Sequence, residues 1–247
     1  MKSITPFRVF MCILFVAGHT MADAQQLNKF EQLGTMLPTP NDTRAASGAP
    51  GKSYWQQKAD YVMDIHLDDL HQKISGKETI TYHNQSPDAL AYLWLQLDQN
   101  QIAEGSDTYS TQTGTIDARV TPGQLARLDN DRVADRGDNI VKVTDAKGTP
   151  LPFTINKTMM RVDLPQPLAS GASYVFNVEW WYNINDRMKE GGRSGYEYFP
   201  KDSNYLYAIA QFFPRMCVPP PINGWPHKQF LGSGEFTLVF GDYDVKI

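Results

Sequence analysis

The chain has 247 residues, of which 41% are hydrophobic, 12% aromatic and 20% charged, and its net charge is −4. That length can bury the core of one large all-β domain or two small ones, and the composition excludes an intrinsically disordered chain. Because the sequence holds no block of Lys and Arg, nothing in it indicates a nucleic-acid partner or an anionic membrane surface.

Residues 1–24 have the features of a secretory signal peptide. Lys2 and Arg8 give a positive start, residues 9–18 (VFMCILFVAG) are apolar but too short to span a bilayer, and residues 22–24 (ADA) form a small-x-small cleavage site. We therefore expect a secreted or periplasmic protein with no membrane span after cleavage. The alternative is an uncleaved N-terminal anchor.

The next segment, residues 25–53, predicts a short helix followed by a linker. Residues 25–36 are compatible with a helix, whereas residues 37–52 are rich in Pro, Gly, Ser and Asn, a composition typical of linkers. The folded domain is expected to cover residues 54–247.

Strand patterns dominate that domain. Residues 59–68 place Tyr61 and Met63 on one face and His66 on the other, the period of two that predicts a half-buried strand. Further strands are predicted within residues 74–84, 90–100, 140–168, 171–185, 205–212 and 234–247. Residues 100–135 are polar and predict a surface excursion that is helical or loose. Many short strands with turn signals between them predict an all-β fold, an antiparallel β-sandwich or saddle.

Neither cysteine indicates a disulfide or a catalytic nucleophile. Cys12 lies in the apolar segment of the signal peptide, so cleavage leaves Cys217 alone and an intrachain disulfide is impossible. We expect Cys217 to be a buried, small apolar residue, because no histidine stands in a recognisable partner motif for a cysteine nucleophile.

His66 and His71 are the histidines nearest to a metal-binding arrangement. Their spacing is i, i+5 across a strand and a turn, whereas the paired ligands of H-E-x-x-H are spaced i, i+4 on a helix. His66 is expected to face solvent, and His83 and His227 are isolated. The sequence therefore predicts no metal site in this chain.

The glycine-rich segment at residues 189–200 (KEGGRSGYEYFP) fits neither phosphate-loop template, so it predicts a surface turn. Ser194 within it has no base motif nearby and is not expected to be a nucleophile.

Trp180 and Trp181 are adjacent in a predicted strand and must face opposite sides of it. With Trp94 they could form a carbohydrate-stacking platform, although tryptophans more often pack a core. One of the adjacent pair is expected in the core, and the other needs a cover.

Residues 205–212 (YLYAIAQF) carry an amide at the end of an apolar strand. Alternation places Tyr205, Tyr207, Ile209 and Gln211 on one face, so Gln211 follows three apolar neighbours. On composition alone, the simpler interpretation is an amide at the rim of the sheet, satisfied by backbone groups.

Several blocks of this sequence, in order, resemble the N-terminal domain of exported bacterial metallopeptidases of the aminopeptidase N family, the gluzincins. The blocks are YWQQKADYVMDIHLDD, ISGKETITYHNQSPDALAYLWLQLDQN, INKTMMRVDLPQPL, YNINDRMKEGGRSGYEYFP and AQFFPRM…NGWPHKQFLGSGEFTLVFGDYDVKI. The resemblance covers residues 54–247. It implies a saddle-shaped antiparallel β-structure that packs on a thermolysin-like catalytic domain of the same polypeptide.

In that family the zinc ligands, H-E-x-x-H and a downstream Glu, and the G-x-M-E-N motif lie in the catalytic domain. The sequence ends before any of them, so we expect the chain to be truncated, to hold no cofactor and to be inactive alone. The resemblance implies that Gln211 reaches into the active-site cleft and binds the free α-amine of a peptide substrate, and that Ile209 lies near the first substrate pocket.

One departure from the family pattern lies at Pro219, Pro220 and Pro221, where the family has an acidic, tyrosine-containing turn. Three prolines fix φ and remove donors, so this loop is expected to differ. The alternative function is a free-standing exported β-sandwich module that binds glycan or another protein.

Overall fold

The computed structural model describes residues 41–111, 119–125, 136–190, 194–219, 225, 228–232 and 239–247. The predicted signal peptide and the helix at residues 25–36 lie outside these ranges. Contacts divide the chain into two units, Met1–Lys52 and Ser53–Ile247. Within the described residues, no helix is both long enough and apolar enough to cross a membrane.

In the first unit, residues 41–52 form a local turn. The Asn41 side-chain oxygen accepts the backbone N–H groups of Thr43 and Arg44, and the Gly51 N–H donates to the Thr43 carbonyl. An asparagine that bonds the backbone two residues on is a standard turn former.

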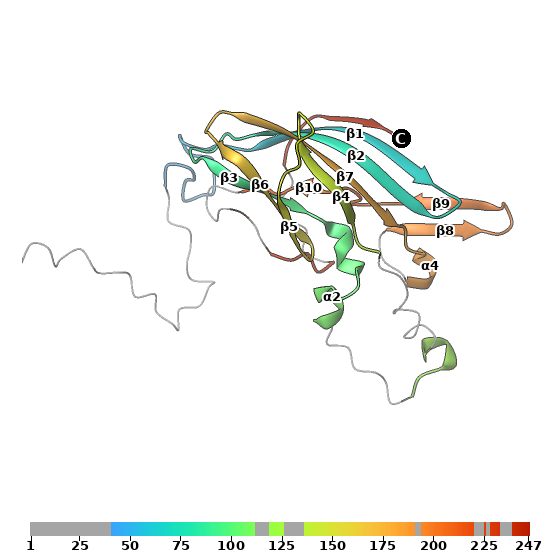
Figure 1. Ribbon diagram of the computed structural model, residues 1–247. Coiled ribbons are helices and arrows are strands. Elements are labelled where there is room, and N and C mark those ends of the chain that lie inside the picture. Colours follow the sequence, from blue (N-terminus) through green and yellow to red (C-terminus); the bar gives the residue numbers. More distant parts are fainter. Residues whose placement is uncertain are drawn as a thin grey trace, which may run out of the picture. The chain divides into compact units, whose positions relative to one another are not determined.

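The second unit contains a five-stranded sheet of order β11-β1-β2-β7-β4. Its strands are β1 (Lys58–Asp68), β2 (Lys73–His83), β4 (Asn139–Asp145), β7 (Ser173–Asn183) and β11 (Tyr243–Lys246). All neighbours pair antiparallel except β1 and β11, which run parallel. Figure 1 shows β1, β2 and β7 side by side in one curved layer.

A four-stranded sheet of order β10-β3-β6-β5 and a two-stranded sheet complete the unit. The four strands are β10 (Arg215–Met216), β3 (Leu90–Gln96), β6 (Met159–Leu168) and β5 (Phe153–Asn156). The two are β8 (Gly195–Phe199) and β9 (Asn204–Ala208). Short helical turns are η1 (Asp98–Ile102), α2 (Asp107–Ser110) and α4 (Arg187–Glu190).

The core forms where the alternating apolar faces of the two larger sheets meet, so the predicted all-β fold is confirmed. The predicted inward faces are buried, as Tyr61, Met63, Leu93 and Leu95 show. Burial of these faces supplies the main stabilising free energy, since no disulfide links the described residues.

The adjacent tryptophans also behave as predicted. Trp180 is 1% exposed in the core, and Trp181 faces the other side of β7. The cover of Trp181 is a lysine of the neighbouring strand: Lys73 Nζ lies 3.9 Å from the centroid of the Trp181 ring.

The strand predicted over residues 205–212 ends earlier. β9 stops at Ala208, and residues 209–214 form an irregular turn before β10. The period-two argument for the orientation of Gln211 therefore fails, because the chain leaves the extended conformation two residues before that amide. β8, the partner of β9, is a strand that the sequence pattern did not predict.

Candidate functional site

A pocket of about 360 Å³ opens where the turn after β9 meets strands β1, β10 and β11. Its lining residues are Tyr61, Ile209, Gln211, Phe212, Phe213, Arg215, Met216, Val239 and Tyr243. Both residues named from the family resemblance, Ile209 and Gln211, are among them. The structure thus brings these two side chains together, although not by the strand alternation that the sequence suggested.

Aromatic rings form the walls of this pocket. Tyr61 stacks on Tyr243 with ring centroids 5.0 Å apart and an interplanar angle of 6°, and Phe213 meets Tyr61 edge-on at 5.6 Å. Phe212 lies edge-on to Phe213 at 5.1 Å. Edge-on and offset ring pairs are favourable arrangements that hold each ring in place, so these walls are preformed.

The backbone at Gln211 has a left-handed conformation, with φ of +55°. Such values are uncommon for a residue other than glycine and cost about 1–2 kcal/mol, so the neighbouring structure has to enforce them. Ser194 contributes to this, because its hydroxyl donates to the Ala210 carbonyl at 3.1 Å and accepts the Ala210 N–H at 2.9 Å. Ser194 therefore has a structural role in this turn.

Gln211 is half-buried, and its side-chain amide makes no hydrogen bond to any residue that the structure describes. The simpler interpretation, an amide satisfied by backbone groups, finds no such hydrogen bond among the described residues. An amide can accept through its oxygen and donate through its nitrogen, so Gln211 keeps its hydrogen-bonding capacity for a ligand.

Arg215 gives the pocket a polar base. It is 7% exposed and forms an ion pair with Asp98, which is 2% exposed, while the hydroxyl of Tyr61 accepts the Met216 N–H at 2.9 Å. A buried guanidinium is tolerated only with a carboxylate partner. Sequence reasoning missed this pair, whose partners lie 117 residues apart.

Glu78 is a buried carboxyl close enough to two tyrosines of the pocket, Tyr61 and Tyr243, to affect their ionisation. It is 1% exposed on the inner face of β2, and neither carboxyl oxygen has a hydrogen-bond partner among the described residues. Burial and the nearby Asp138 raise the pKa of Glu78 well above its usual range, and burial together with Asp98 raises the pKa of Asp138 to about 8. Burial therefore favours the protonated, neutral form of Glu78 in the folded protein.

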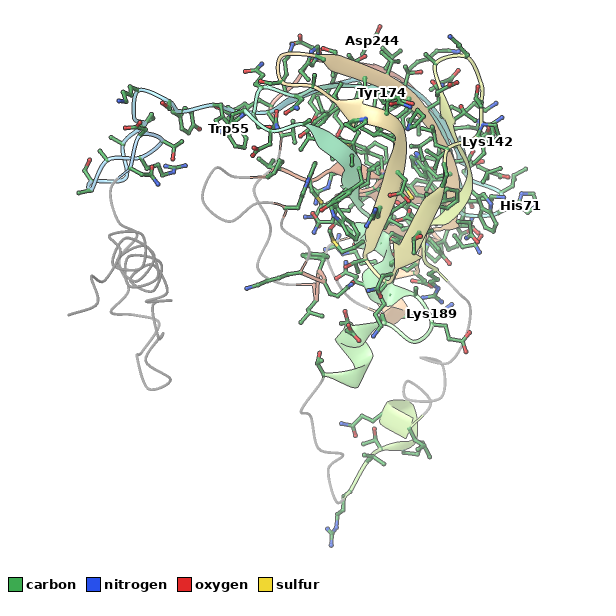
Figure 2. All side chains as sticks on the ribbon, turned by 60° about the vertical axis from the view of Figure 1, so that its left-hand side comes forward. Trp55, His71, Lys142, Tyr174, Lys189 and Asp244 are labelled. Carbon is green, nitrogen blue, oxygen red and sulfur yellow. The ribbon has the colours of Figure 1, made fainter. Side chains whose placement is uncertain are left out.

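The histidines weighed as metal ligands do not converge. His66 is exposed on β1, and His71 lies in the turn after β1, where its Nδ1 is 2.8 Å from Asp68 Oδ2 and its ring projects from the sheet (Figure 2). No group of three or more His, Cys, Asp or Glu side chains within the described ranges could hold a metal ion. His227 lies outside those ranges.

Cys217 is a buried apolar residue, as predicted. It is 5% exposed, and burial, with Asp98 nearby, raises the pKa of its thiol to about 12. A thiol with so high a pKa forms little thiolate and is a poor nucleophile. Of the three prolines after it, Pro219 is buried, whereas Pro220 and Pro221 lie outside the described residues.

A second concavity of about 320 Å³ lies on the outer face of the five-stranded sheet. Trp181, His66, Ser75 and Glu179 line it together with Lys73. Glu179 is engaged with Lys77 and Lys142 across the sheet at 3.4 and 3.0 Å. The Trp181 indole is thus surrounded by side chains that can donate or accept hydrogen bonds. Such a lining suits a polar ligand that has one apolar face.

Comparison with known proteins gives only distant likenesses. No family model and no curated protein matches the chain. Among solved structures, an M1 zinc metallopeptidase from Deinococcus radiodurans is 12% identical with a TM-score of 0.33, over 55% of this chain and 22% of that one.

A mutant two-domain M1 zinc metallopeptidase bound to L-tryptophan is 12% identical with a TM-score of 0.34, over 71% of this chain and 29% of that one. This chain thus spans less than a third of the solved chains that it resembles. At these values the likeness identifies neither a family nor an activity.

Proposed function

We propose that this chain is the substrate-anchoring N-terminal domain of a secreted or periplasmic zinc aminopeptidase, which removes N-terminal residues from peptides. The observation that carries the proposal is the pocket where Gln211 presents an unengaged amide beside Ile209 and a set of aromatic rings. A residue held at a positive φ next to a pocket is a frequent mark of a functional position.

The chemistry of the pocket suits a peptide with a free N-terminus. The oxygen of the Gln211 amide can accept a hydrogen bond from the substrate ammonium, and an amide does not titrate near neutral pH. Ile209 and the aromatic walls would bury an apolar side chain next to that ammonium. The Arg215 charge is offset by Asp98, which limits its repulsion of the ammonium.

In this proposal hydrolysis belongs to a thermolysin-like domain of the same polypeptide. That domain would supply a zinc ion, which activates a water molecule, and a glutamate as general base. The residues described here would bind and orient the substrate. This chain alone should bind no stoichiometric zinc and should not cleave an aminoacyl arylamide.

The test is steady-state kinetics of Gln211→Ala in the polypeptide that carries the catalytic domain. A hydrogen bond to a charged group contributes about 1.5–3 kcal/mol, so kcat/KM should fall roughly ten- to a hundredfold. The loss should be larger for substrates with a free amine than for N-acylated ones.

Gln72→Ala is the matched control, because Gln72 is also a glutamine at positive φ, +48°, but does not line the pocket. Gln72→Ala should leave kcat/KM unchanged. An unchanged kcat/KM for Gln211→Ala, or a loss that follows the melting temperature in both variants, would contradict the proposal.

The second candidate function is a glycan-binding module, and the concavity around Trp181 favours it. A sugar could stack on the indole in place of Lys73 and bond to His66 and Ser75. Titration of the chain with soluble oligosaccharides should then change its tryptophan fluorescence, and Trp181→Ala should abolish that change. An unaltered spectrum across the oligosaccharide series would remove this candidate.

A further inference from the structure

Three side chains on the outer face of the five-stranded sheet form a continuous hydrogen-bonded chain. They come from adjacent strands: Asp60 from β1, His83 from β2 and Ser173 from β7. Asp60 Oδ2 lies 2.9 Å from His83 Nε2, and Ser173 Oγ lies 2.8 Å from His83 Nδ1. Because successive residues of a strand face opposite sides, this cluster lies across the sheet from the Tyr61 wall of the pocket.

The roles of the hydrogen bonds follow from the ionisation of Asp60. Burial acts in the opposite direction, but hydrogen bonds from the Asp242 N–H, Lys58 and His83 lower the pKa of Asp60 to about 2. The ionised carboxylate can only accept, so a neutral imidazole carries its proton on Nε2. Its Nδ1 is then an acceptor and takes the hydrogen bond of the Ser173 hydroxyl.

The carboxylate is itself held in place on its other oxygen. Asp60 Oδ1 accepts the Asp242 N–H at 2.8 Å and lies 2.9 Å from Lys58 Nζ. Oδ2 is thereby aimed at the histidine. Ser173 at the other end is exposed, whereas the side chains of His83 and Asp60 are 29% and 27% exposed.

We propose that Ser173, His83 and Asp60 form an acyl-transfer site, in which Ser173 is the nucleophile towards small activated esters. The arrangement has the three roles that define such a site: a nucleophile bonded to a base, and a base oriented by a third group. In this site Nδ1 faces the serine and Nε2 faces the carboxylate. This activity is independent of the function proposed for the Gln211 pocket.

The reaction balances without a cofactor. Ser173 Oγ attacks the ester carbonyl carbon while its proton passes to His83 Nδ1. The imidazolium is stabilised by Asp60. Collapse of the tetrahedral intermediate breaks the bond to the leaving alcohol, which takes the proton from Nδ1 and leaves an acyl-serine. Water then hydrolyses the acyl-serine with His83 again as the base, which regenerates the hydroxyl.

The geometry also bounds the rate. A positioned general base contributes typically 10²–10⁴-fold, and an oxyanion donor contributes a further 10²–10³-fold. The contacts described here supply the general base, so we count only the first of these two factors. We therefore expect slow acylation, confined to esters with a good leaving group, rather than efficient turnover of ordinary esters.

The experiment exposes the full chain to p-nitrophenyl acetate and locates acetyl groups by peptide mass spectrometry over time. Ser173 should be acetylated at least tenfold faster than Ser75 of β2, which lies on the same face of the sheet opposite His66 but makes no hydrogen bond to a histidine among the described residues. His83→Gln should slow acetylation of Ser173 at least tenfold. His71→Gln, which removes an exposed histidine in the turn after β1, outside this cluster, should not change it.

The comparison of Ser173 with Ser75 in the unaltered chain needs no variant, so it stands even if His83→Gln weakens the fold. Equal acetylation of the two serines would overturn the proposal. So would an unchanged Ser173 rate in a folded His83→Gln variant, because the three residues would then only link the strands.

Discussion

Arg215 and Asp98 form an ion pair almost wholly withdrawn from water, although 117 residues separate them along the chain. The pair joins β10 to the turn η1 that follows β3, and it underlies the pocket around Gln211. Its geometry ties the position of the pocket to the integrity of the core.

We expect Arg215→Met to destabilise the protein by about 3–5 kcal/mol, because it removes one partner of a buried ion pair. Urea unfolding measures the change. Arg161→Met is the control, since the Arg161–Asp163 pair is about two-fifths exposed and such pairs contribute at most about 1 kcal/mol. Similar losses in the two variants would contradict the special role of the buried pair.

The conformation of Gln211 predicts a pattern across substitutions. Gln211→Gly should leave stability within about 1 kcal/mol of the parent, because glycine adopts a φ of +55° without steric cost. Gln211→Val should lose about 1–2 kcal/mol, since a β-branched residue disfavours that region. Thermal melting of the two variants tests this. A valine variant as stable as the glycine variant would refute the left-handed turn.

Stability should depend on pH through two carboxyl groups, Glu78 and Asp138, whose pKa values are raised in the folded protein. The folded protein holds protons on Glu78 and Asp138 that the unfolded chain releases, so their stabilisation is complete below pH 3.8 and is lost as pH rises through about 8 for Asp138. Each group contributes a slope of at most about 1.4 kcal/mol per pH unit. Asp60, with its lowered pKa, acts oppositely and only at lower pH, where stability is lost as pH falls towards about 2.

The variants Glu78→Gln and Asp138→Asn should each flatten this decline, because an amide cannot ionise. Chemical unfolding at pH 5, 7 and 9 gives the slopes. A Glu78→Gln variant that keeps the parental slope would show that Glu78 does not hold its proton in the folded state.

A glycine in β2 is required by close packing. A Cβ at Gly76 would lie 2.5 Å from the Trp180 ring and 2.9 Å from Ile65. Gly76→Ala should cost about 1–3 kcal/mol through overpacking. Gly123→Ala, whose Cβ would lie 4.0 Å from Thr121 Oγ1 at ordinary contact distance, should stay within about 0.5 kcal/mol. Thermal melting of the two variants measures the difference. Equal melting temperatures would show that the core at Trp180 accommodates the added methyl group.

The sequence predicted the strands whose burial is one-sided, because alternation at Tyr61, Met63 and Leu93 reports directly on which face meets the core. It also predicted that Trp180 and Trp181 would face opposite sides of their strand. Alternation says nothing of which strand becomes a neighbour, so it could not reveal the Asp60–His83–Ser173 chain. That chain depends on the registers of two strand pairs.

Two other features, the turn at Gln211 and the burial of Glu78, were not predicted from the sequence, for different reasons. Gln211 was singled out by resemblance, but its left-handed turn carries no glycine to mark it, so a strand was predicted there instead. Glu78 did leave a signal: it falls in phase with the buried Ile74 and Ile80. A carboxyl in that phase identifies either a register break or a buried acid, and pattern alone does not choose between them.

The parallel pairing of β11 with β1 has a consequence for how the protein folds as it is synthesised. Tyr61 pairs with Tyr243, so this edge of the sheet cannot close until the intervening chain and β11 itself have left the ribosome. Contacts of such sequence separation form late and slow folding. Until then β1 presents an unpaired edge that another nascent chain could occupy, so the yield of folded protein should fall as its rate of synthesis rises.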